Sequence, residues 1–184
     1  MPNETLITLG SAHELLRRSI RDVPDFPKPG VCFKDITPLL ADPSALALAV
    51  ELMANPFRAS GVELVLGAES RGFIFGTAVA QALSAGFVPI RKPGKLPSKT
   101  HGVDYGLEYG SDRVEIHQDA FQSGTRVLLV DDLLATGGTM RACRDLIEQL
   151  DGVLVGMTVL IELLDLKGRE CLGTDLEVHA VLQY

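Results

Sequence analysis

The chain has 184 residues, of which 46% are apolar and 22% charged, and such a chain can bury a core without disulfides or a structural metal. Its 24 acidic residues outnumber its 17 lysines and arginines, and the net charge of −7 argues against general binding to a nucleic-acid backbone. Three cysteines without a CxxC spacing argue against a disulfide framework. No apolar run reaches ~18 residues, and the N-terminus does not resemble a secretory signal, so we expect a cytoplasmic protein.

The chain is predicted to begin with a short helix and an extended segment. Ser11 and Glu14 have the spacing of a capping box, followed by a helix that reaches Ile20. Three prolines in residues 23–30 favour an extended backbone. A short strand is then predicted over residues 31–36.

A longer helix is predicted next. Asp42 is a suitable N-cap, and Pro43 fits the first turn of a helix. The helix is predicted to end near Gly61. Its predicted buried stripe consists of Leu46, Val50, Met53 and Phe57.

From residue 62 onward, short apolar strands alternate with helices. The predicted strands are residues 62–68, 87–91, 126–130, 153–164 and 176–182. The predicted helices are residues 72–84 and 139–150. Because each strand is apolar enough to be covered on both faces, the pattern predicts an α/β protein with a mainly parallel sheet between layers of helices.

Residues 92–125 lack the period of a helix. Two strands, at residues 105–109 and 113–118, are predicted to form a hairpin around Gly110 and Ser111. A polar excursion of this length is typical of an active-site lid. We therefore predict a flap at residues 92–118 on a single domain that spans all 184 residues.

The strongest chemical signal is in residues 127–139, with the sequence Val-Leu-Leu-Val-Asp-Asp-Leu-Leu-Ala-Thr-Gly-Gly-Thr. Asp131 and Asp132 follow a buried strand at the carboxyl edge of the sheet, where open α/β sheets bind ligands. Residues 135–139 are small and lead into a helix, so their N–H groups and hydroxyls suit a phosphate. Because acids repel phosphate, the two aspartates need sugar hydroxyls or a bridging divalent cation as partners. The segment predicts a ribose 5-phosphate site, and the alternative is an ordinary glycine-rich turn.

Basic residues gather at the end of the strand predicted at residues 87–91. Arg91 can bind a phosphate through two parallel hydrogen bonds, and Lys92 and Lys95 act as point charges. In an acidic chain this cluster indicates an anionic ligand, and the alternative is a solvated basic loop. Residues 69–72 (Glu-Ser-Arg-Gly) also lie between a strand and a helix and present N–H groups to an anion.

Residues 127–139 resemble the phosphoribosyl pyrophosphate (PRPP) signature of the type I phosphoribosyltransferases. Further segments resemble one branch of that family, the adenine phosphoribosyltransferases, and the resemblance extends from Phe26 to the C-terminus. These segments are residues 26–38 (FPKPGVCFKDITP), 69–73 (ESRGF), 91–97 (RKPGKLP), 105–110 (YGLEYG) and 166–170 (LKGRE).

This resemblance implies the type I phosphoribosyltransferase fold, with a small N-terminal hood within residues 1–36 and a flexible flap at residues 92–118. It implies a purine salvage enzyme that makes AMP and pyrophosphate from adenine and PRPP. Mg²⁺ would be bound through PRPP rather than in an all-protein site, and the enzyme would be a homodimer. Two alternatives stay open: another purine base as substrate, and a PRPP-binding regulator without turnover.

The resemblance also implies roles for particular residues. Glu108 is expected to take a proton from adenine, and Arg71 to lie near the reacting groups. The phosphate and ribose of PRPP or AMP are expected at Asp131, Asp132, Ala135, Thr136, Gly137, Gly138 and Thr139. Pyrophosphate is expected at Glu69, Ser70, Arg91, Lys92 and Lys95, with a cis peptide between Glu69 and Ser70.

By the same resemblance, adenine is recognised by the hood. The expected contacts are Val31, Cys32, Phe33, Lys34 and Leu163, and Tyr105 and Tyr109 are expected in the flap. Many relatives carry arginine in place of Lys34 and valine in place of Cys32, so base affinity depends on whether backbone or side chains make these contacts. The four histidines show no ligand spacing, so no metal is assigned to side chains alone.

Overall fold

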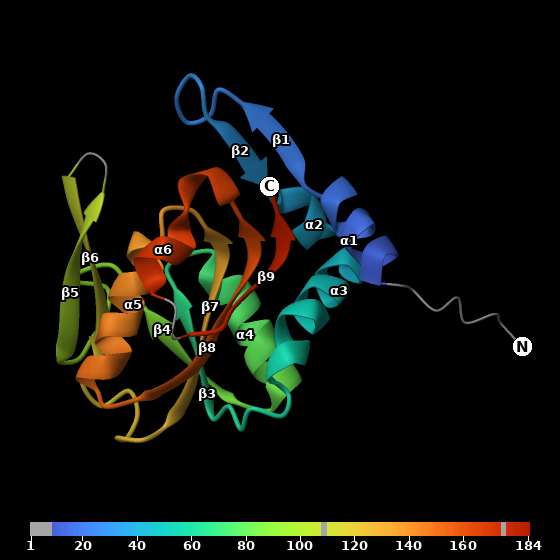
Figure 1. The fold of residues 1–184 in the computed structure, drawn as a ribbon. Coiled ribbons are helices and arrows are strands. Elements are labelled where there is room, and N and C mark those ends of the chain that lie inside the picture. Colours follow the sequence, from blue (N-terminus) through green and yellow to red (C-terminus); the bar gives the residue numbers. More distant parts are fainter. Residues whose placement is uncertain (1–8, 108–109, 174–175) are drawn as a thin grey trace, which may run out of the picture. The chain divides into compact units, whose positions relative to one another are not determined.

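A five-stranded parallel sheet forms the centre of residues 52–184 in the computed structural model (Figure 1). In spatial order, its strands are β4 (Gly86–Ile90), β3 (Leu64–Ala68), β7 (Arg126–Leu134), β8 (Val153–Glu162) and β9 (Val178–Gln183). The predicted parallel sheet is confirmed. Four strands lie close to their predicted bounds, whereas β7 continues to Leu134 instead of ending at residue 130.

The structure describes residues 9–107, 110–173 and 176–184, which fall into two compact units. The boundary lies between Glu51 and Leu52, inside helix α3 (Pro43–Ala54). The single domain with its hood and flap stays a prediction. In the described part of the chain, no helix is both long and apolar enough to cross a membrane.

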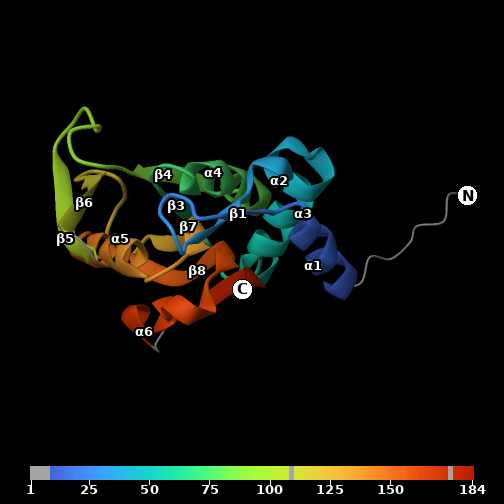
Figure 2. The ribbon, with the colours of Figure 1, turned by 90° about the horizontal axis from the view of Figure 1, so that it is seen from above.

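Helices cover both faces of the sheet, as Figure 2 shows. Gly67 of β3 faces α4 (Gly72–Leu83), and Leu66 points to the opposite face, where α5 (Gly138–Gln149) packs. Both helices match their predicted bounds within one residue. The core on the α5 side includes the buried side chains of Leu66, Ala68, Leu129, Cys143, Leu146, Ile147, Met157 and Val159.

Among the described residues, three short helices escaped the sequence analysis. They are α2 (Thr37–Ala41), η2 (Leu164–Leu166) and α6 (Gly168–Leu172). A fourth, η1 (Asn55–Phe57), lies within the helix predicted to end near Gly61, which is wrong in its end because α3 stops at Ala54. Helices of three to five residues span little more than one turn, so no apolar period can reveal them.

The predicted hairpin is longer than expected and has a different register. Strands β5 (Thr100–Leu107) and β6 (Gly110–His117) pair antiparallel, and the last pair is Leu107 with Gly110. The predicted strand bounds, 105–109 and 113–118, are therefore wrong. Figure 1 shows the hairpin beside α5, and Val114 and Ile116 are fully buried in the core on that side. The base of the predicted flap is thus part of the core.

Unit 1 begins with α1 (Leu9–Arg18), in which Ser11 is an internal residue. The predicted capping box at Ser11 is wrong, and Glu14 instead pairs with Arg18 at 3.0 Å, one turn later. An unpredicted strand, β1 (Arg21–Pro24), overlaps the start of the proline-rich segment and pairs antiparallel with β2 (Cys32–Asp35).

Helix α3 starts where the sequence predicts. The Asp42 side chain accepts hydrogen bonds from the N–H groups of Ser44 at 2.8 Å and Ala45 at 3.0 Å, which confirms the N-cap. The buried stripe is displaced by one residue at its start: the fully buried side chains are those of Ala45, Ala49, Met53 and Ala54 in α3 and Phe57 in η1. Three of the fully buried positions are alanines, and a prediction based on large apolar residues does not find them.

The start of α4 lies very close to β3. A Cβ atom on Gly67 would lie 2.9 Å from the carbonyl oxygen of Gly72 and 2.9 Å from Cε2 of Phe87. Because one of these neighbours is backbone, a side chain at Gly67 requires the strand and the helix to separate.

We expect Gly67→Ala to lower the free energy of unfolding by about 1–3 kcal/mol, the usual cost of overpacking a core. Urea unfolding followed by circular dichroism measures this change. The control is Gly10→Ala on α1, where a Cβ atom meets nothing within 4 Å and alanine favours the helix. Equal stability of Gly67→Ala and the wild type would contradict the tight α4–β3 contact.

Candidate functional site

A pocket of about 230 Å³ opens at the carboxyl edge of β3 and β7. All but one of its lining residues belong to the site predicted from the sequence, the exception being Leu133. The lining residues are Glu69, Ser70, Arg71, Lys92, Asp131, Asp132, Leu133, Ala135 and Thr139. The structure therefore brings together the loops predicted to bind pyrophosphate and ribose phosphate.

Asp131 and Asp132 lie in the part of β7 that continues past its pairing with β3. Pairing of β3 with β7 ends at Gly67 and Val130, so Asp131 and Asp132 extend beyond β3. Asp132 is 6% exposed, and its Oδ2 pairs with Nε of Arg71 at 2.9 Å. Arg71 is the residue before α4, so this ion pair joins the start of α4 to β7.

Burial changes the acidity of both aspartates. Burial, and then the neighbouring charge of Asp132, raise the pKa of the Asp131 carboxyl well above its ordinary value. Burial also raises the pKa of Asp132, although the charge of Arg71 acts in the opposite direction. Asp131 accepts the N–H of Asp132 at 2.9 Å, which fixes its position. Such carboxylates gain from a partner that supplies hydroxyl donors or positive charge.

The small-residue loop at the start of α5 forms a second, smaller hollow of about 70 Å³. Gly137 is the N-cap of α5 and has φ of +86°, a conformation that favours glycine. A Cβ atom there would also collide with the carbonyl oxygen of Gly168 in α6. The loop is therefore held against α6, with the first N–H groups of α5 directed as in an anion site.

Glu69 gathers the basic residues that follow β4. Its carboxylate accepts Nε of Arg91 at 3.3 Å, the N–H of Lys92 at 2.9 Å and Nζ of Lys95. Burial raises the pKa of Glu69, but these hydrogen bonds and charges outweigh it and hold the pKa below its ordinary value. The Glu69–Ser70 peptide is cis, as the resemblance implied.

The residues predicted to contact adenine are divided between the two units. Residues 31–34 lie in unit 1, where Cys32 is an exposed free thiol and Nζ of Lys34 pairs with Asp22 at 2.7 Å. Leu163 follows β8 in unit 2 and donates its N–H to the carbonyl oxygen of Leu134 at 3.0 Å. Their joint role stays a prediction. Glu108 and Tyr109, predicted for catalysis and the flap, lie outside the described residues.

Sequence reasoning missed an ion pair behind the loop, between a buried carboxylate and a partly exposed arginine. Glu162, 3% exposed at the end of β8, accepts Nε and Nη2 of Arg169 at 2.6 and 2.8 Å, and Nε2 of Gln183 at 2.9 Å. The hydrogen bonds from Arg169 lower the pKa of Glu162 despite its burial. The pair ties α6 to the sheet, so α6 forms a fixed wall behind Gly137. The only sign of this pair in the sequence was the family resemblance at residues 166–170, which include Arg169.

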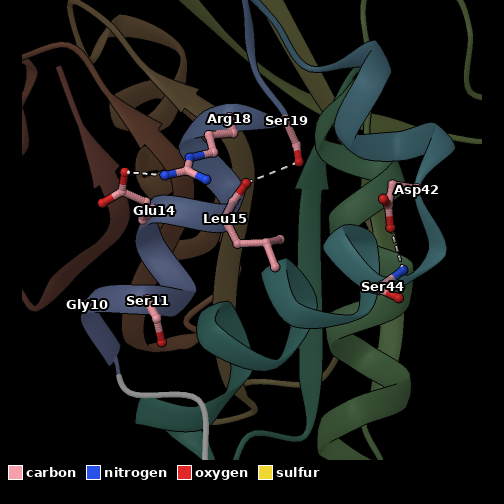
Figure 3. A pocket seen from close by; sticks show the side chains of 8 residues that line it. All are labelled: Gly10, Ser11, Glu14, Leu15, Arg18, Ser19, Asp42 and Ser44. Atoms are coloured by element: carbon pink, nitrogen blue, oxygen red, sulfur yellow. Dashed lines mark hydrogen bonds and ion pairs between the residues drawn. The ribbon is translucent and has the colours of Figure 1, made fainter. Parts of the chain in front are cut away.

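A larger hollow, of about 650 Å³, lies in unit 1 and contains none of the predicted site residues (Figure 3). Its charged side chains are engaged with their own neighbours: Glu14 with Arg18, and Asp42 with the N–H of Ser44. The hollow therefore lacks the converging polar groups of the pocket at the sheet edge. Among the described residues, no cluster of three or more His, Cys, Asp or Glu is arranged to hold a metal ion.

The sequence is similar to a known protein family and to known proteins. The phosphoribosyl transferase domain family matches residues 36–172. The chain is 60% identical to an adenine phosphoribosyltransferase of Symbiobacterium thermophilum over 166 residues, which are 90% of this chain and 95% of the relative.

Two solved structures share the fold. The adenine phosphoribosyltransferase of Rhodothermus marinus has a TM-score of 0.91 at 51% identity, covering 95% of this chain and 99% of that one. That of Saccharomyces cerevisiae, in complex with adenine and an imino-altritol bisphosphate, has a TM-score of 0.88 at 36% identity, covering 94% and 99%. The predicted phosphoribosyltransferase fold is confirmed.

We expect Asp131→Asn to stabilise the protein more at pH 8 than at pH 4. Folded Asp131 keeps its proton to a higher pH than the unfolded chain, whose carboxyl has a pKa near 3.8, so the folded state loses stability as pH rises through the raised pKa. Asparagine cannot titrate there, and its oxygen can still accept the N–H of Asp132. Urea unfolding at the two pH values measures the difference.

The control for that experiment is Asp119→Asn, which removes one negative charge at an exposed position. A gain for Asp131→Asn that is the same at both pH values, or larger at pH 4, would contradict the raised pKa.

Proposed function

The chain belongs to the adenine phosphoribosyltransferases, a branch of the phosphoribosyl transferase domain family, and we propose that its pocket joins adenine to the ribose of PRPP. The products are AMP and pyrophosphate, and the reaction is a purine salvage step. The observation that carries this proposal is that Glu69–Arg71 and Asp131–Asp132 line one pocket, while Asp131, Ala135 and Thr139 line both this pocket and the smaller hollow of the phosphate loop.

The two ends of PRPP have different partners in this proposal. Its 5-phosphate binds the loop at residues 135–139, through the N–H groups at the start of α5 and the hydroxyls of Thr136 and Thr139. Its pyrophosphate binds the N–H groups after Glu69 and the side chains of Arg91 and Lys95. This distribution fits the structure because the two loops follow the neighbouring strands β7 and β3 and line one pocket.

The ribose lies between these anchors, with its hydroxyls on Asp131 and Asp132. In the reaction, N9 of adenine forms a bond to C1 of the ribose, and the bond from C1 to the pyrophosphate oxygen breaks. Positive charge develops on the sugar, and the nearby carboxylates stabilise it. Arg71 pairs with Asp132 at 2.9 Å, and in this proposal it stabilises the negative charge on the departing pyrophosphate.

The donor set fits Mg²⁺ that arrives with PRPP. Mg²⁺ commonly binds one or two carboxylates together with substrate phosphates and waters, and the pocket supplies two adjacent carboxylates, Asp131 and Asp132. When bound, Mg²⁺ would neutralise charge on the phosphate oxygens.

Adenine recognition and proton transfer complete the proposal. We assign the base to Val31–Lys34 and Leu163, and the proton from its imidazole ring to Glu108. The family resemblance supports both assignments, and the adenine held by the yeast relative supports the choice of base.

A homodimer and a cytoplasmic location are further parts of the proposal. The family resemblance supports the homodimer. Cys32, Cys143 and Cys171 are free thiols, as is usual in a reducing compartment.

In a competition assay, we expect the protein to consume adenine in preference to hypoxanthine and xanthine when all three are supplied with PRPP and Mg²⁺. The reason is that the 6-amino group of adenine donates a hydrogen bond where a 6-oxo group can only accept one. Chromatography of the nucleotides measures the products, and addition of EDTA tests the need for Mg²⁺. Preference for a 6-oxo purine would refute the choice of substrate, and PRPP binding without turnover would indicate a regulator.

We expect Glu108→Ala to lower kcat by about 10²–10⁴, the usual contribution of a general acid or base, with little change in PRPP affinity. Steady-state kinetics and calorimetry with PRPP separate the two effects. Asp119→Ala is the control for loss of an exposed acid. An unchanged kcat would remove Glu108 from the mechanism.

A further inference from the structure

Lys92 has two partners that the sequence did not connect with it. Its Nζ donates to the Tyr105 hydroxyl at 2.8 Å and pairs with Asp112. The Tyr105 hydroxyl in turn donates to Oδ2 of Asp112 at 3.0 Å. Tyr105 and Asp112 are directly opposite each other on β5 and β6. One residue from each strand of the hairpin therefore binds the Lys92 ammonium.

The same tyrosine also touches the phosphate loop. Thr139 Oγ1 donates to the Tyr105 hydroxyl in a long hydrogen bond of 3.4 Å. The Tyr105 ring also covers Gly138: a Cβ atom on Gly138 would lie 3.4 Å from Cδ2 of Tyr105 and 3.5 Å from the Gly106 carbonyl oxygen. The Tyr105 hydroxyl thus accepts hydrogen bonds from Lys92 and Thr139 and donates one to Asp112. These three bonds use the whole hydrogen-bonding capacity of the hydroxyl.

This network makes the Lys92 side chain a poor ligand for pyrophosphate. Lys92 and Asp112 are both partly buried, with 31% of each side chain exposed, so breaking their ion pair leaves two partly desolvated charges. The hydrogen bonds to Asp112 and Tyr105 outweigh burial and raise the pKa of Lys92. The hydrogen bond from Lys92, with those from the Arg113 N–H and the Tyr105 hydroxyl, lowers the pKa of Asp112 despite its burial. The backbone N–H of Lys92 remains in the pocket, where Glu69 accepts it.

We propose that Lys92, Tyr105 and Asp112 form a latch that fixes the hairpin against the phosphate loop, and that Lys92 is a positioning residue rather than a ligand of pyrophosphate. The latch sets the position of Gly138 and Thr139, which the proposed function assigns to the 5-phosphate of PRPP. Its catalytic consequence rests on that proposed function. The contact itself does not.

The first test measures the contact in the protein without ligand. Asp112→Asn and Lys92→Met each remove one charge of the latch, and Lys99→Met removes an exposed charge from the same segment as a control. We expect faster hydrogen–deuterium exchange in peptides that cover residues 135–140, as well as in the hairpin, for both latch variants and not for the control. Unchanged exchange at residues 135–140 would overturn the latch.

The second test separates a positioning role from direct binding. We expect Lys92→Met, Asp112→Asn and Tyr105→Phe each to lower kcat/KM for PRPP by about tenfold, the scale of one hydrogen bond to a charged group. The double variant Lys92→Met/Asp112→Asn should lose no more than either single variant, because the two residues act as one unit.

Inhibition by pyrophosphate distinguishes the positioning role of Lys92 from direct binding of pyrophosphate. If Lys92 bound pyrophosphate directly, Asp112→Asn would release its ammonium and tighten pyrophosphate inhibition, whereas Lys92→Met would weaken it. Effects of opposite sign would overturn the proposal. If the exchange experiment shows the coupling but the wild type does not convert adenine, the latch stands and the proposed function fails.

Discussion

Acidic side chains hold the basic side chains of the pocket in place, and the geometry of the site depends on this pairing. Arg71 is bound to Asp132, Arg91 and Lys95 are bound to Glu69, and Lys92 is bound to Asp112. Long basic side chains lose several rotatable bonds of freedom when a ligand orders them. Because carboxylates already order these side chains, an anionic ligand meets a preorganised set of donors.

The parallel sheet explains why these groups meet. Strands β3 and β4 end at one edge, where Glu69 and Arg91 follow them, and the last residues of β7 at the same edge include Asp131 and Asp132. Close backbone contacts then fix the loops: Gly67 admits the start of α4, and Gly137 admits α6. These contacts leave no room for a side chain, so the loops have little freedom to shift relative to the sheet.

The sheet and the phosphate loop could be predicted because their signals are local. A run of apolar residues marks a strand, and the segment from Asp131 to Thr139 carries its chemistry in consecutive positions. The hairpin register could not be predicted in this way. Centring the turn on Gly110 and Ser111 does not place Tyr105 opposite Asp112, so their hydrogen bond was invisible in the sequence. Pairing in a hairpin depends on its turn, and a small error in the turn changes every cross-strand neighbour.

The partner of Lys92 could not be predicted from the sequence, because residue propensities do not show which side chains meet after folding. Three basic residues within five positions look equivalent in the sequence, yet Arg91 and Lys95 turn to Glu69 while Lys92 turns to the hairpin. A charged side chain takes the partner that is closest after folding, and that partner came from another strand. The same argument reconciles a net charge of −7 with an anionic substrate. Arg71 lines the pocket, and Arg91 and Lys95 pair with Glu69, which also lines it, so an arriving phosphate meets positive charge there.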